Sequence, residues 1–114
     1  MDRDKDTIFD ILHAGQLIQQ FKAGMTQTEF RQDPKTQSAI LHQITVMGEA
    51  VKRLSPAFRS QHPDIPWRQI AGMRDFLIHA YDSVDLNTVW QVTERDIPDL
   101  ISRLSQLRPS PSVG

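Results

Sequence analysis

The sequence contains no cysteine among its 114 residues. Disulfide bonds and thiolate chemistry are therefore excluded, and the composition is compatible with a reducing compartment. No apolar run approaches the roughly 20 residues that a membrane-spanning helix needs. The first residues, Met1 to Asp6, carry charges of both signs and lack the apolar segment of a secretory signal. These absences predict a soluble cytoplasmic protein that has no membrane partner.

An excess of charge of one sign is also missing. The 13 lysine and arginine residues are nearly balanced by 14 aspartate and glutamate residues, and the formal net charge is -1. A broad basic surface for DNA is therefore not expected, whereas a small basic cleft for RNA is compatible with this balance. The length suits one domain with a hydrophobic core of its own.

Apolar residues recur with helical spacing along most of the chain, and no segment alternates as a half-buried strand does. The first helix is predicted to start at Asp4 or Asp6 as its cap and to stop at Gly24. Thr26 and Glu29 have the spacing of a capping box, which predicts a short helical turn that ends near residue 33.

The clearest predicted helix covers residues 34–54, because Asp33 is a good N-cap and Pro34 suits the first helical position. Its apolar stripe consists of Ile40, Ile44, Met47, Val51 and Leu54. A connection with three prolines follows, containing a short turn around residues 57–60, and Pro66 then suits the start of a helix that runs to about Ala80.

Asp85 is the expected cap of a further helix, and Pro98 is expected to kink or restart it with Asp96 as a new cap. Residues 1–107 therefore form one predicted domain, and residues 108–114 a flexible tail. The predicted fold is all-α, an antiparallel bundle of four to five helices.

One cluster suggests chemistry at a phosphate. Arg74, His79 and Tyr81 follow each other at short spacing near the end of an apolar helix. Arginine grips phosphate in a fixed geometry, and histidine exchanges protons near neutral pH. Tyrosine supplies a hydroxyl that donates, accepts or is modified. Asp75 precedes His79 by one helical turn, so its carboxylate is able to orient the imidazole.

The helix that carries this cluster is apolar around most of its circumference, so it should be covered on most sides. A bundle of this size rarely encloses a helix fully, which suggests that a second copy of the chain supplies the missing cover. Arg74 and His79 lie roughly 140° apart around a regular helix. Either the helix unwinds near Ala80, or a two-fold axis brings Arg74 of one chain to His79 of another.

Each of these residues also has a purely structural interpretation. His79 pairs with Asp75 as a partly buried histidine, or Arg74 pairs with Glu49 across the bundle. Glu49 and Arg53 have the spacing of an ordinary ion pair on a helix surface. Glu49 is equally suited to hold the Arg74 side chain in position without contacting the substrate.

Four other residues fit packing roles: Gly48 allows two helices to approach, Tyr81 fits a core position, and Trp67 and Trp90 pack inside the bundle or stack on a base. The remaining histidines are too scattered to hold a metal ion, and no metal or other cofactor is expected. They are His13, His42 and His62.

The pattern Arg74-x-x-x-x-His79-x-Tyr81 resembles the signature of HepT-like proteins, a branch of the HEPN superfamily. The blocks at residues 48–53 and 65–73 resemble the same family in register, as do the blocks after the motif at 84–85, 89–90 and 97–100. The likeness covers most of residues 3–107, and the motif with these flanks is specific.

This resemblance implies a homodimeric helical bundle with its active cleft at the two-fold interface. It implies a metal-independent endoribonuclease toxin with Arg74 and His79 as catalytic residues. It further implies an MntA-type nucleotidyltransferase partner, the antitoxin, which transfers AMP to Tyr81 and silences the nuclease. Two alternative functions stay open. The first is a non-catalytic subunit that serves a nucleotidyltransferase, and the second is a structural helical adaptor.

Overall fold

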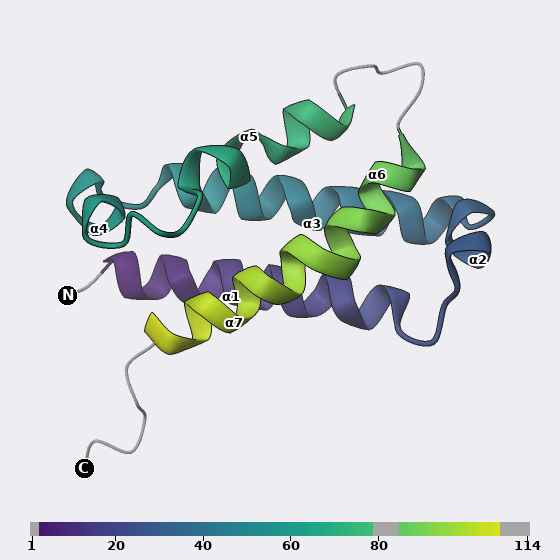
Figure 1. Cartoon of the computed structure of the whole chain (residues 1–114), viewed down its shortest axis with the longest axis horizontal. Helices are drawn as coiled ribbons and strands as arrows, with labels where there is room; N and C mark the ends of the chain where they lie inside the picture. The colour runs from purple at the N-terminus through teal and green to yellow at the C-terminus, as the bar shows by residue number, and fades with distance from the viewer. Residues whose placement is uncertain (1–2, 79–84, 108–114) are drawn as a thin grey trace, which may run out of the picture.

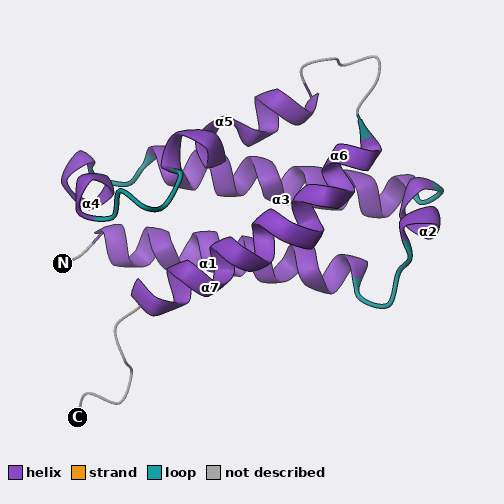
Figure 2. Cartoon of the chain, viewed as in Figure 1, coloured by secondary structure: helices purple, strands orange, loops and turns teal. Residues whose placement is uncertain are grey.

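A computed structural model describes residues 3–78 and 85–107, and these residues are almost entirely helical (Figure 2). Within them the helices are α1 (Arg3–Lys22), α2 (Gln27–Arg31), α3 (Pro34–Lys52), α4 (Pro56–Gln61), α5 (Trp67–Ile78), α6 (Leu86–Gln91) and α7 (Ile97–Leu107), with a π-helical segment η1 (Val92–Asp96) between the last two. The predicted all-α bundle is confirmed. The predicted tail at residues 108–114 lies outside the described residues.

Helices α1, α3 and α5 run in alternating directions, and the α6–η1–α7 segment crosses α3 and α1 (Figure 1). Helix α3 packs against both α1 and α5, while α7 packs against α1. In the described part of the chain, no helix is long and apolar enough to cross a membrane. Helix α3 is therefore the central element, and it holds the helix that carries Arg74.

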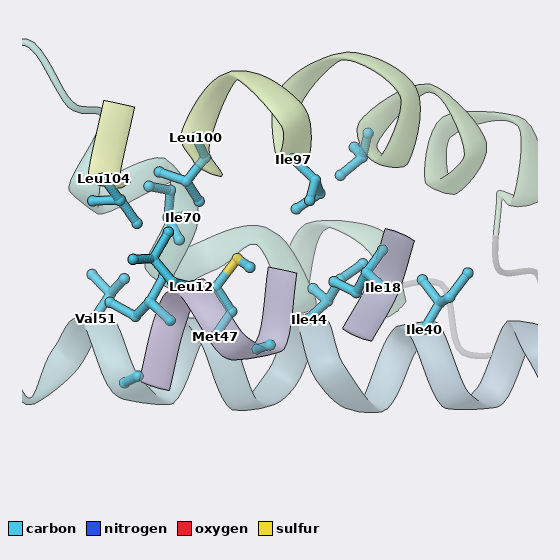
Figure 3. Packing of buried hydrophobic residues seen from close by; sticks show 14 of the residues in the cluster. Leu12, Ile18, Ile40, Ile44, Met47, Val51, Ile70, Ile97, Leu100 and Leu104 are labelled. Atoms are coloured by element: carbon cyan, nitrogen blue, oxygen red, sulfur yellow. The ribbon is translucent and has the colours of Figure 1, made fainter. Parts of the chain in front are cut away.

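The predicted apolar stripe of α3 forms the centre of the core (Figure 3). All five of its residues are buried, although the helix ends at Lys52, two residues before the predicted end at Leu54. Ile40 and Ile44 are completely inaccessible. Fully burying such a side chain contributes roughly 1.5–3 kcal/mol. Residues from α1, α5 and α7 meet this stripe, among them Leu12, Ile18, Ile70, Ile97, Leu100 and Leu104.

Capping residues set most helix starts as predicted. Thr26 Oγ1 accepts from the Glu29 N–H at 3.1 Å, and the Glu29 carboxylate accepts from the Thr26 N–H at 2.8 Å, which completes the capping box. Asp33 caps α3 through the Thr36 N–H. Gly24 has a φ of 74°, a left-handed conformation that suits glycine after the end of α1.

The expected cap of α1 is wrong, because Asp4 and Asp6 lie inside its first turn. The Asp4 carboxylate instead accepts from the Ser55 N–H at 2.8 Å and from the Ser55 hydroxyl at 2.7 Å. Ser55 in turn caps α4 by accepting from the Phe58 N–H. Asp4 therefore fastens α1 to the start of α4.

Of the two outcomes expected at Pro98, a kink or a restart, the restart with Asp96 as a new cap does not occur. The helix continues through η1 (Val92–Asp96), where the next N–H donates to a carbonyl five residues earlier. Pro98 has no N–H to donate to the Thr93 carbonyl at that step. The Gln19 side-chain amide of α1 donates to this carbonyl at 3.0 Å instead. A contact from another helix thus allows proline to stay inside a continuous helix.

A buried lysine fixes the same region to α1. The Lys22 side chain is only 6 % exposed. Its ammonium donates to Thr93 Oγ1 at 3.0 Å, pairs with Glu94, and lies 4.1 Å from the centroid of the Trp90 ring. Three kinds of contact replace the water that this charge loses, so Lys22 belongs to the structure of the bundle.

Candidate active site

Helix α5 carries Arg74 and is held against α3 by close backbone packing at Gly48. A side-chain carbon at Gly48 would lie 3.1 Å from the Ala71 carbonyl oxygen and 3.3 Å from that of Ile70. Only a hydrogen fits there without a shift, which confirms the predicted packing role of Gly48. Trp67, Ile70 and Leu77 are buried along the same helix.

Arg74 lies on the apolar arc of α5, yet its guanidinium reaches the surface. Its side chain is 52 % exposed, and Arg74 Nη1 lies 3.3 Å from Asp75 Oδ1. The Asp75 side chain is more exposed still. In the described residues this neighbour is the only ion-pair partner of Arg74. Most of its five donors therefore remain available for an anion.

Glu49 does not contact Arg74 within the described chain. Its carboxylate pairs with Lys52 at 3.1 Å on the surface of α3, and Arg53 pairs with Asp10 of α1 at 3.8 Å. The Glu49–Arg53 and Glu49–Arg74 pairs considered from the sequence are therefore not formed. The supporting role of Glu49 stays a prediction.

His79 and Tyr81 lie outside the described residues, as does the predicted contact between Asp75 and His79. The structure describes the chain on both sides of them: α5 ends at Ile78, and α6 begins at Leu86. The structure therefore describes the arginine of the motif and the two helices on either side of the motif's last residues.

The start of α6 is held by its cap and by α2. Asp85 accepts from the Thr88 N–H at 3.2 Å and from the Thr88 hydroxyl at 2.7 Å, and these bonds lower the pKa of the Asp85 carboxyl, with a smaller contribution from Arg31. Asn87 Oδ1 accepts from Arg31 and from Gln27 of α2. The chain therefore enters α6 at a fixed point.

A groove of about 580 Å³ opens between α5 and the η1–α7 segment. We call it the α5–α7 groove. Ile70, Met73, Val92 and Leu100 supply its apolar lining, and Gln69, Gly72, Asp96, Asp99 and Arg103 its remaining surface, together with Pro66. Sequence reasoning missed this groove, because it depends on how far α5 and α7 stand apart.

The two tryptophans pack inside the bundle, since Trp67 is 5 % and Trp90 is 8 % exposed. Trp67 Nε1 donates to the His62 carbonyl at 3.0 Å, and the Trp90 ring lies 5.4 Å from that of Phe30. Neither ring offers a face on which a base would stack. Across residues 3–78 and 85–107, no three histidine, aspartate or glutamate side chains gather as a metal site requires.

These features define a class of protein: a small all-α bundle that presents an exposed arginine on a helix followed by the histidine and tyrosine of the motif. A family model described as Ribonuclease HepT-like matches residues 11–107. The chain belongs to this family.

Three relatives of similar sequence carry ribonuclease names. A Thermococcus cleftensis protein named "Probable ribonuclease HepT" is 41% identical over 104 residues, which cover 91% of this chain and 94% of the relative. A Methanocaldococcus jannaschii protein named "Putative RNase" is 35% identical over 100 residues, covering 88% of this chain and 83% of the relative. Another "Putative RNase", from Caldanaerobacter subterraneus, is 37% identical over 91 residues, 80% of either chain. No solved structure matches the chain significantly.

Proposed function

We propose that this protein is a metal-independent endoribonuclease whose active site combines Arg74 and His79. The observation that carries the proposal is the state of Arg74: an exposed guanidinium whose described ion-pair partner is its neighbour Asp75 alone, in a chain of the ribonuclease HepT-like family. The names of the relatives support RNA as the substrate.

RNA carries its own nucleophile, the 2′-hydroxyl, so a nuclease without a metal needs only acid–base and electrostatic catalysis. His79 removes the 2′-hydroxyl proton or protonates the leaving 5′-oxygen. Arg74 stabilises the negative charge on the phosphorane oxygens. The P–O5′ bond breaks as the 2′-oxygen bonds to phosphorus, and the products are a 2′,3′-cyclic phosphate and a 5′-hydroxyl.

The two groups reach one phosphate most simply across a dimer. Arg74 and His79 are separated by roughly 140° on a regular helix. A two-fold axis near α5 brings Arg74 of one chain toward His79 of its partner, which gives two equivalent sites. Asp75 and Glu49 are proposed to support the site, Asp75 by orienting the imidazole.

Tyr81 is proposed to be the off switch of a toxin–antitoxin pair. A partner nucleotidyltransferase of the MntA type transfers AMP from ATP: the Tyr81 phenol oxygen bonds to the α-phosphorus, and pyrophosphate leaves. The added group brings bulk and negative charge beside the site of the RNA phosphate. Occlusion and repulsion then stop cleavage.

Cleavage of RNA in excess chelator tests the nuclease. The parent protein should cut RNA, and His79→Ala should lose at least about 100-fold in rate. His13→Ala, which removes an exposed histidine of α1, is the matched control and should cut normally. A parent that leaves RNA intact favours the non-catalytic subunit, and a His79→Ala variant as fast as the parent contradicts the assigned chemistry.

Incubation with the partner nucleotidyltransferase and ATP tests the switch separately. The parent should gain the mass of AMP on the peptide containing Tyr81 and lose its nuclease activity. Tyr81→Phe should stay unmodified and active. Continued AMP transfer to the same peptide in Tyr81→Phe would place the acceptor on another residue.

A further inference from the structure

Arg31 of α2 is held differently from the other arginines of the described chain. Three of them pair with a carboxylate, namely Arg53, Arg74 and Arg103. Among the described arginines that lack such a pair, Arg31 alone is fixed by a side-chain hydrogen bond. Its Nη1 donates to Asn87 Oδ1 at 3.0 Å, and both side chains are exposed. An amide oxygen holds the guanidinium in place but does not neutralise its charge.

The side chains around Arg31 are rich in hydrogen-bond donors. Gln27, one turn earlier on α2, donates through Nε2 to the same Asn87 oxygen at 3.1 Å. Both lone pairs of that oxygen are then used, whereas most N–H groups of Arg31 and the amide NH2 of Asn87 have no partner among the described residues. We call Gln27, Arg31 and Asn87 the Arg31 cluster. Donors arranged around a fixed positive charge suit the oxygens of a phosphate.

Two carboxylates in the same region are committed to helix caps. Glu29 accepts from the Thr26 N–H at 2.8 Å, and Asp85 accepts from the Thr88 N–H and hydroxyl. Neither carboxylate forms an ion pair with Arg31 in the part of the chain that the structure describes. The positive charge of the cluster is therefore left for a ligand.

The Arg31 cluster borders the segment that carries the last two motif residues. Helix α2 packs against α6, and Asn87 lies in the first turn of α6, where the described chain resumes after α5. The chain from Ile78 to Asp85 spans at most about 25 Å, and Arg74 lies one turn before Ile78. A short single-stranded RNA is therefore long enough to contact both arginines.

We propose that the Arg31 cluster binds a phosphodiester of the RNA substrate beside the one that is cut. This rests on the proposed function, because it takes RNA as the substrate. Arg31 donates to the phosphate oxygens, while Asn87 and Gln27 hold it in position. Because the guanidinium is fixed before RNA arrives, less side-chain entropy is lost on binding. A chain with a net charge of -1 thus holds RNA at a fixed cation, without a broad basic surface.

RNA binding in a His79→Ala background tests the site, since this change leaves the RNA intact. With a labelled single strand of about 12 nucleotides, Arg31→Gln should weaken Kd about fivefold at low salt and lower the slope of log K against log salt by about 0.7. Arg59→Gln removes the same charge from α4, at the opposite end of the bundle from α2, and should bind like the background (Figure 1). Equal losses in both variants, or no loss in Arg31→Gln, overturn the proposal.

Asn87→Asp gives a second test in the same background. It keeps an oxygen that holds Arg31 but adds a carboxylate that neutralises it. RNA binding should therefore fall at least as far as in Arg31→Gln, while the melting temperature stays at or above that of the background. Gln61→Glu on α4 adds the same charge and should bind normally. A purely structural contact between Arg31 and Asn87 predicts undiminished binding in Asn87→Asp, and that result overturns the proposal.

Cleavage kinetics separate this site from the nuclease itself. With His79 intact, Arg31→Gln should raise KM for the same RNA about fivefold and leave kcat unchanged, because Arg31 touches no reacting atom. A parent that binds RNA with the dependence on Arg31 described above but cuts none supports the site and contradicts only the nuclease. A parent that binds no RNA overturns the site. So does an Arg31→Gln variant that weakens the binding of the partner nucleotidyltransferase and leaves RNA binding unchanged.

Discussion

Lys22 and Arg74 are two cations on the apolar sides of their helices, and the fold surrounds them in opposite ways. Lys22 is buried, with an acceptor hydroxyl, a carboxylate and an aromatic ring in contact. Arg74 is 52 % exposed and contacts the carboxylate of its neighbour at 3.3 Å. The contacts of Lys22 are all made within the chain, whereas most donors of Arg74 have no partner among residues 3–78 and 85–107.

Arg74→Ala should give the largest effect, and only on activity. Removing a group that stabilises charge in the transition state lowers the cleavage rate by about 100- to 1,000-fold. Because the side chain is exposed, the free energy of unfolding should change by less than about 0.5 kcal/mol. Initial rates in chelator and thermal unfolding measure the two effects. Arg53→Ala serves as the control, and equal losses in both variants would remove Arg74 from the site.

Lys22→Ala should show the opposite pattern. Loss of the buried ammonium removes the donor to Thr93 Oγ1 and the ion-pair partner of Glu94, and it leaves a gap beside Trp90. We therefore expect a loss of about 2–4 kcal/mol in the free energy of unfolding. Denaturant unfolding measures it, and Lys35→Ala on the surface of α3 is the control. A loss below about 0.5 kcal/mol would mean that the Lys22 contacts contribute little to stability.

Two glycines extend the comparison to the two sides of α5. Gly48→Ala forces the backbones of α3 and α5 apart and should cost about 1–3 kcal/mol. Gly72→Ala meets nothing within the described chain and should stabilise the single subunit by up to about 1 kcal/mol. Thermal unfolding measures both variants, and equal shifts in melting temperature would contradict the assigned difference in packing.

The smallest expected effect is on the stability of the protein at acidic pH. Hydrogen bonds from Thr88 lower the folded-state pKa of Asp85 below its usual value of 3.8. The resulting stability is present above the unfolded-state pKa and is lost as pH falls through the lower folded-state pKa. Asp85→Asn keeps a capping side chain but does not titrate, so the difference in melting temperature from the parent should shrink as pH falls from about 5 to about 2.5. A difference that is independent of pH would contradict this expectation.

The sequence predicted those features that depend on neighbouring residues. The capping box at Thr26, the cap at Asp33 and the stop at Gly24 are local signals, and the stripe of α3 follows from spacing alone. The path through Pro98 was not predictable, because it depends on Gln19 of another helix reaching the Thr93 carbonyl. Local rules that favour a break were overridden by this contact.

The candidate site was predictable to a smaller extent. Arg74 was singled out by its motif, and its exposure follows from a charged side chain on an apolar arc. The burial of Lys22 had a signal in the sequence, since it continues the apolar stripe of α1 four residues after Ile18. The groove beside Gly72 had none, because an empty space is defined only once α5 and α7 are in place.

The π-helical segment η1 has a consequence for how α6 and α7 can vary. A π-turn closes its hydrogen bond over five residues in place of four, so it takes up one extra residue while the turns on both sides keep their faces toward the bundle. Val89 and Trp90 of α6 and Ile97 and Leu104 of α7 are accordingly all buried. Deleting a single residue from η1 should therefore leave a regular α-helix that turns nearly the same sides of α6 and α7 toward the bundle.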